Sequence, residues 1–128
     1  MRIRAFAALF LAGAGALAVA GRPSLNAYFQ STLKDAAYQK KTFEKVSKAW
    51  KAPAAADLPA IGKKTVVQSV IAKDGKLASA TVSLSSGKKG WDDAALKAVK
   101  TAAPFDALPA GYNYPTLEVH FHFEAAAK

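Results

Sequence analysis

The sequence contains no cysteine among its 128 residues. Disulfides therefore cannot hold the fold together in any compartment, and cysteine nucleophiles and thiolate metal sites are excluded. Histidine is scarce as well, with two residues in the whole chain. Nucleophilic catalysis needs a base placed beside the nucleophile, and the sequence shows neither such a trio nor a glycine-rich phosphate loop. We therefore expect no catalytic site, no resident metal and no cofactor.

Positive charge, in contrast, is in excess. Eighteen lysine and arginine residues stand against nine acidic ones, which gives a formal net charge of +9. A basic exterior attracts anionic surfaces such as lipid headgroups and cell-wall polymers. Binding to such a surface is therefore one functional hypothesis for this chain. A nucleic-acid partner is not expected, because the first residues predict export.

Residues 1–20 have the layout of a secretory signal peptide. Arg2 and Arg4 give a basic start, an uncharged stretch rich in alanine, leucine and glycine follows, and residues 18–20 (Ala-Val-Ala) form a small-x-small cleavage pattern. The apolar stretch is shorter than the roughly 17–25 residues that span a bilayer. We predict cleavage after Ala20 and a periplasmic mature protein. A retained inner-membrane anchor facing the periplasm is the alternative.

The mature chain opens with a lead-in and a helix. Residues 21–31 predict a short lead-in that is either flexible or continuous with the helix. Residues 32–51 predict the helix, because apolar side chains recur at helical spacing along one face. Thr32, followed three residues later by Asp35, is the expected start.

Three segments predict β-strands. Residues 64–72 are dense in β-branched side chains, and residues 77–85 alternate between apolar and polar. The Asp74-Gly75 pair between them favours a tight hairpin turn. Residues 116–124 alternate strictly and give the clearest strand signal in the chain.

A second helix is expected over residues 92–103, with two aspartates at its start and a proline directly after it. The order helix-strand-strand-helix-strand predicts an α+β fold, with a three-stranded antiparallel sheet covered on one face by the two helices. The predicted domain spans residues 32–124, and residues 125–128 are expected to be a frayed tail.

Several motifs in this order resemble the C-terminal domain of the TonB/TolA family, over residues 38–123. Residues 50–53 (Trp-Lys-Ala-Pro) are similar to that family's aromatic-x-x-Pro helix exit, and residues 66–75 to its first strand ending in Asp-Gly. Residues 85–95 resemble its Ser-Ser-Gly loop and the aromatic-Asp start of its second helix. Residues 102–109 (Ala-Ala-Pro-Phe-x-x-Leu-Pro) resemble its exit into the last strand.

The resemblance implies a function in protein binding. Members of the family form the periplasmic end of proteins that link the inner membrane to outer-membrane partners, and a short extended segment of the partner adds alongside their last strand. An edge strand offers unpaired backbone groups for such an addition. The expected partner is therefore a protein of the cell envelope, such as an outer-membrane transporter. The predicted partner-binding residues are Thr116, Leu117, Glu118, Val119, His120, Phe121, His122 and Phe123.

The sequence departs from the better-known members in one respect. They carry a membrane anchor and a long arm across the periplasm, whereas here the N-terminus predicts cleavage and the domain follows closely. Without an anchor the protein could not be pulled by an inner-membrane motor. Energy transduction is therefore the part of the family's function that we carry over least.

Other interpretations of the last strand stay open. It could be merely structural, with its edge covered by the tail or a loop, or two copies could pair through their sheet edges as a homodimer. His120 and His122 could chelate a metal between Glu118 and Glu124. However, a solvated strand face explains this stripe equally well, and a third strong ligand is not evident. We therefore predict no metal site.

Overall fold

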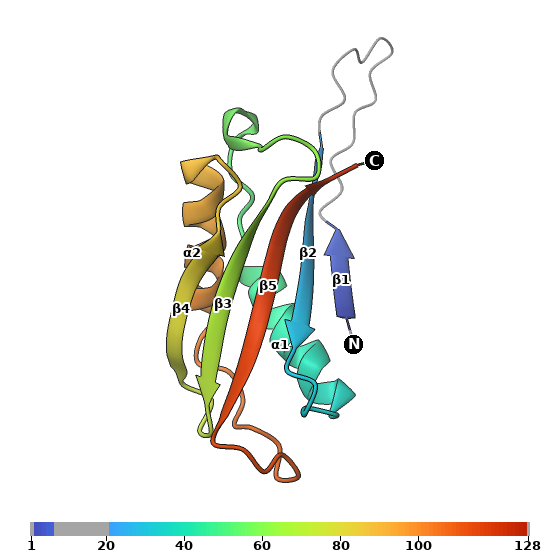
Figure 1. Cartoon of the computed structure of the whole chain (residues 1–128), viewed down its shortest axis with the longest axis vertical. Coiled ribbons are helices and arrows are strands. Elements are labelled where there is room, and N and C mark those ends of the chain that lie inside the picture. The colour runs from blue at the N-terminus through green and yellow to red at the C-terminus, as the bar shows by residue number, and fades with distance from the viewer. Residues whose placement is uncertain (1, 7–20, 128) are drawn as a thin grey trace.

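The computed structural model describes residues 2–6 and 21–127 and has the predicted α+β fold (Figure 1). The helices are α1 (Ala36–Ala49) and α2 (Lys89–Ala102), with a short 3-10 helix η1 (Ala55–Asp57). The strands are β1 (Arg2–Phe6), β2 (Arg22–Phe29), β3 (Lys64–Ala72), β4 (Leu77–Leu84) and β5 (Thr116–Ala126).

The strands form one five-stranded sheet in the order β1-β2-β5-β3-β4, and every neighbouring pair is antiparallel. The prediction of three strands is therefore wrong in number. β2 forms in the expected lead-in, and β1 forms within the predicted signal peptide. Residues 7–20, with the predicted cleavage point, lie outside the described residues. Export and cleavage stay predictions.

β5 lies in the middle of the sheet, between β2 and β3 (Figure 1). Its ladder with β2 runs from Phe29 opposite Val119 to Arg22 opposite Ala126. The strand also extends to Ala126, so most of the expected tail belongs to it. A last strand with a free edge is therefore not what the described chain contains.

Both helices cover the same face of the sheet, and the core lies between the helices and the sheet. Alternate side chains of β5 point into this core, as the sequence alternation predicts. The indole Nε1 of Trp91 donates to the Phe123 carbonyl at 2.8 Å, which ties α2 to β5. Trp50 packs edge-on against Phe123, with the ring centroids 5.0 Å apart. The aromatic residues thus fix the helices over β5.

The first helix begins later than predicted. Asp35 is its N-cap and accepts a hydrogen bond from the Tyr38 amide at 2.9 Å. Thr32 instead lies in a turn, and Leu33 is buried in the core just before the helix. The cap therefore lies three residues after the predicted start. The second helix, in contrast, begins three residues before Asp92, at Lys89.

The predicted hairpin between β3 and β4 is confirmed. Gly75 has a φ of +93°, and a Cβ there would lie 2.1 Å from the Phe105 carbonyl oxygen, so glycine is required. The Phe105 amide also donates to the Gly75 carbonyl at 2.9 Å. The turn is therefore joined to the loop that leads into β5. Within the described ranges, no helix is long and apolar enough to cross a membrane.

Candidate functional site

The eight predicted binding residues lie along β5, with side chains on two opposite faces. The apolar ones are fully buried in the core beneath the helices: Leu117, Val119, Phe121 and Phe123. Glu118, His120 and His122 are half-buried on the other face, and Thr116 is exposed at the start of the strand. Because the apolar side chains already pack within the domain, what β5 can offer a partner is chiefly its backbone.

The backbone of β5 is engaged on both sides. β3 pairs with it from Lys64 opposite Glu124 to Ala72 opposite Thr116. On the other side, the β2 ladder continues into Gln30, whose amide donates to the Glu118 carbonyl at 3.1 Å. The Gln30 side chain in turn accepts from the Glu118 amide at 3.1 Å. A partner strand alongside β5 would therefore have to take the place of β2 or of β3.

Bonding in an antiparallel ladder alternates along each strand. The bonds between Gln30 and Glu118 consequently place the amides of His120, His122 and Glu124 on the β2 side. The amides of Val119, Phe121 and Phe123 face β3. β5 thus carries two sets of amides, one bonded to β2 and the other to β3. The exchange of each set can therefore reveal the loss of one particular neighbour.

The polar stripe predicted on β5 exists. The Nε2 atom of His120 lies 2.5 Å from a carboxylate oxygen of Glu118, and the Gln68 side chain donates to the same oxygen at 3.2 Å. The His122 ring packs against Tyr28 of β2, with the centroids 4.4 Å apart. Burial, together with the charge of Lys64 and the neighbouring His120, lowers the pKa of His122 to about 4. His122 is therefore neutral at physiological pH.

No group of three or more metal-ligating side chains that could hold an ion occurs in the part of the chain that the structure describes. The stripe is better explained by hydrogen bonding between neighbouring strands, because Glu118 is held by both His120 and Gln68.

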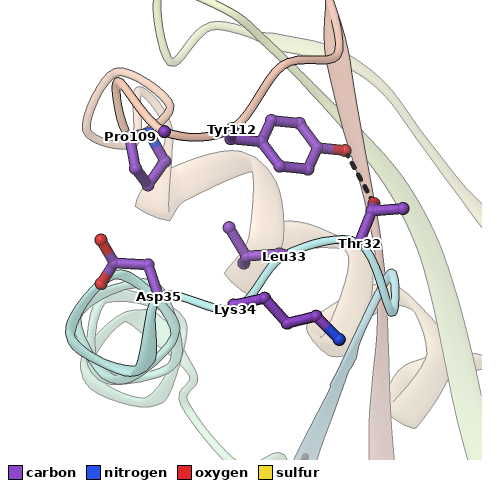
Figure 2. Close-up of a pocket in the computed structure, with 7 residues that line it drawn as sticks. Thr32, Leu33, Lys34, Asp35, Pro109 and Tyr112 are labelled. Carbon is purple, nitrogen blue, oxygen red and sulfur yellow. Dashed lines mark hydrogen bonds between the residues drawn. The ribbon is translucent and has the colours of Figure 1, made fainter.

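Two hollows lie where β2 ends. One, of about 290 Å³, lies between the turn after β2 and the loop before β5 (Figure 2). It is lined by Thr32, Leu33, Lys34, Asp35, Pro109, Gly111 and Tyr112. Figure 2 shows the charged side chains of Lys34 and Asp35 pointing away from each other. The hollow thus lacks convergent charged groups for a small ligand.

The second hollow is more open to solvent and lies on the ladder itself. It is lined by Tyr28, Phe29, Gln30, Glu118 and His120. These residues belong to the end of β2, the turn after it and the first half of β5. The junction between the two strands is therefore hollowed at the surface, at the end where β2 stops.

Sequence reasoning did not identify β2. Its signal was present, because Leu25, Ala27 and Phe29 alternate with polar or amphipathic side chains in the period of a strand. Pro23 and the short length of the segment weakened that signal, since proline is disfavoured in strands. In the structure Pro23 is the second residue of β2.

Comparison with known proteins gives one match. A family model described as TonB C terminal matches residues 35–123. Neither the curated proteins nor the solved structures contain a match. The matched region begins at the cap of α1 and ends within β5, so it includes β3, β4 and both helices and leaves β2 outside. The match covers well over half of the chain, and the chain belongs to the TonB C-terminal family.

Proposed function

We propose that this chain is a non-enzymatic protein-binding module of the cell envelope, which takes an extended segment of a protein partner alongside β5. Family membership supports the general role, because TonB C-terminal domains interact with envelope proteins such as outer-membrane transporters. The signal-peptide pattern of residues 1–20 supports a periplasmic location.

One observation carries the place of binding. β2 lies outside the family-matched region of residues 35–123, yet it fills one whole side of β5. In this chain the matched region supplies no strand for that side of β5, which supports strand addition there. In this chain the strand is β2, and in the bound state it is the partner's segment.

The chemistry suits strand addition. The amides of His120, His122 and Glu124 supply regularly spaced donors on that side, and the carbonyls of the same residues supply acceptors. Main-chain bonds of this kind give affinity, and pockets for alternate side chains give selectivity.

The absence of cysteine gives a direct test, because one introduced cysteine is the only thiol in the protein. A photoreactive cross-linker would be attached to His120→Cys in the full-length protein and exposed to envelope extract. The control variant carries the same label at Lys97, an exposed residue of α2. We expect an adduct with an identified envelope protein, mapped to one short segment of it, at position 120 and not at position 97.

The mapped segment would then be synthesised and its binding to the unmodified protein measured by fluorescence anisotropy. N-methylation of alternate peptide amides that face β5 should abolish binding, whereas N-methylation of the intervening amides should not. Equal binding by both methylated peptides would contradict strand addition, as would adducts that form only at the α2 control.

A second candidate function rests on charge. The exposed face of α1 carries Lys40, Lys41, Lys45 and Lys48, against one acidic residue of that helix, Glu44. Binding to an anionic surface should weaken steeply between low and moderate salt, because exposed charges are screened over about 10 Å at 0.1 M. Sedimentation with vesicles containing anionic lipid tests it. The double variant Lys40→Gln/Lys48→Gln should lose binding, and salt-independent binding would exclude this function.

A further inference from the structure

β2 contributes to the core as well as to the sheet. Leu25 lies opposite Phe123 and is 1% exposed, and Ala27 lies opposite Phe121 and is 0% exposed. Phe29 is half-buried and packs against the same cluster. The helix-facing side of β2 therefore fills a series of sites along β5, one at every second residue.

These sites differ in size. Ala27 lies opposite Phe121, and α1 lies on the same side of the sheet behind β2 (Figure 1). A fully buried alanine leaves little room for a larger side chain, and overpacking of a filled core is destabilising. The site of Leu25 accepts a branched aliphatic side chain. The sites along β5 therefore select side chains by both polarity and size.

The opposite side of β2 is polar. Ser24 and Asn26 lie opposite Glu124 and His122, and Tyr28 packs on the His122 ring. The fit is not complete here, because the Asn26 side-chain oxygen is buried without a hydrogen-bond partner among the described residues. A buried acceptor without a partner is unfavourable. A different polar side chain at this position could therefore pair better than the one that β2 supplies.

β2 is also separable from the domain. It joins α1 through residues 30–35, and its last side-chain tie to β5 is made by the exposed Gln30. β3 is also tied by side chains to β5 and to the helical layer: the buried hydroxyl of Ser69 donates to the Val119 carbonyl at 2.7 Å, and Thr65 donates to Asp92 of α2. β2 and β1 together form one end of the sheet, so they can leave as a pair while β5, β3 and β4 stay joined.

We infer that β2 occupies the binding site of the partner segment, and that this segment has the same pattern of side chains as β2. Such a segment carries a branched aliphatic side chain at the place of Leu25, a small one at the place of Ala27, and polar side chains between them. The inference rests on the proposed function and specifies its partner. Because β2 is tethered, it competes for β5 at an effective concentration of about millimolar. The partner segment must therefore have a higher intrinsic affinity for β5 than an untethered β2 peptide has.

The first measurement needs no variant. Native-state hydrogen exchange of the full-length protein should show faster exchange for the amides of His120, His122 and Glu124 than for those of Val119, Phe121 and Phe123. All six belong to one strand, so the second set is an internal control. We expect at least a tenfold difference in protection. Equal protection of both sets would mean that β2 leaves only when the whole domain unfolds, and would overturn the inference.

The second measurement uses a peptide with the sequence of residues 22–30 (Arg-Pro-Ser-Leu-Asn-Ala-Tyr-Phe-Gln). Ala27→Asp in the full-length protein places a charge in the core and should free β5 from β2. We expect the peptide to bind this variant at least tenfold more tightly than the unmodified protein, and to restore protection of the His120 and His122 amides. Thr81→Asp, an exposed position on β4, is the control and should bind as the unmodified protein does.

Peptide variants test the pattern. Leucine in place of Ala27, or aspartate in place of Leu25, should each weaken binding to the Ala27→Asp protein at least tenfold. If all peptides bound equally, the inference would fail while strand addition at β5 still stood. If no peptide bound although β2 was released, the proposed site itself would fail. A dimer detected by light scattering, together with no peptide binding, would indicate a second copy as the occupant and would also overturn the inference.

Discussion

β3 and β2 flank β5 with ladders of similar length, but they are attached to the domain in different ways. β3 lies within the family-matched region, continues through a tight turn into β4, and is bonded by side chains to β5 and α2. β2 lies before that region, and its closing tie is the side chain of an exposed glutamine. Equal backbone pairing does not imply equal stability, and we expect β3 to be the neighbour that stays paired with β5 when β2 leaves.

The largest expected difference comes from a matched pair of core truncations. Ile71→Ala on β3 should lower the free energy of unfolding by about 2–5 kcal/mol, because a fully buried side chain is replaced by a cavity. Leu25→Ala on β2 should cost less, since its effect is limited by the free energy at which β2 leaves locally. Urea denaturation of both variants checks this. Equal losses would show that β2 and β3 unfold together.

The next largest effect is expected at Asp92, which holds the β3 side of the domain. Its carboxylate accepts hydrogen bonds from Thr65, Ser85 and Ser86. Asp92→Ala should cost about 1–3 kcal/mol, because the buried Thr65 hydroxyl loses its acceptor. Asp93→Ala, one residue along on the exposed surface, is the control and should change the free energy of unfolding little.

Asp92 also predicts a pH dependence. Burial alone raises the pKa of Asp92, but the hydrogen bonds from Ser85, Thr65 and Ser86 outweigh it, so the pKa lies below its ordinary value of 3.8. The unfolded chain then binds the proton first as the pH falls. Stability from this carboxylate is thus present above about pH 3.8 and is lost as the pH falls through the lower folded value. Asp92→Asn should flatten the acid side of the stability curve in this range.

A smaller effect on the free energy of unfolding is expected from one polar side chain on each side of β5, Ser69 of β3 and Gln30 after β2. Ser69→Ala removes the buried hydrogen bond from β3 to the Val119 carbonyl and should lower the free energy of unfolding by about 1 kcal/mol. Gln30→Ala should leave the global value within about 0.5 kcal/mol and speed exchange at His120 and His122. A global loss for Gln30→Ala as large as that for Ser69→Ala would remove the distinction between the flanks.

The last comparison concerns the titration of His122, which lies between Asn26 of β2 and Val66 of β3. Because burial, Lys64 and His120 lower its pKa from 6.5 to about 4, the unfolded chain binds more protons than the folded one between these values. The free energy of unfolding should therefore decline as the pH falls from about 6.5 to about 4. His122→Gln should remove this slope, and His120→Gln is the control that should retain most of it.

The sequence predicted those elements whose signals are local. β3, β5 and the β3–β4 turn were found because their side-chain patterns and the Asp74-Gly75 pair determine the structure within a few residues. The start of α1 was misplaced, because Thr32 and Asp35 are both good caps. The choice between them is made by burial of Leu33 in the core, which is a tertiary effect.

The neighbours of β5 could not be predicted in the same way. Alternation specifies which face of a strand is buried, but it does not specify which strand pairs with which edge. β2 pairs with β5 across almost the whole length of the chain, from residues 22–29 to residues 119–126. That pairing depends on Leu25 and Ala27 fitting beside Phe123 and Phe121, and a sequence pattern does not contain such a fit.

β1 adds a consequence for the timing of activity. It pairs with the outer side of β2, from Arg2 opposite Tyr28 to Phe6 opposite Ser24, and it lies within the predicted signal peptide. Cleavage after Ala20 would remove β1 and leave the outer backbone groups of β2 without that neighbour. β2 would then be held on one side only and would leave β5 more readily. Proteolytic maturation would thus set the moment at which the module becomes able to exchange its own strand for another protein's.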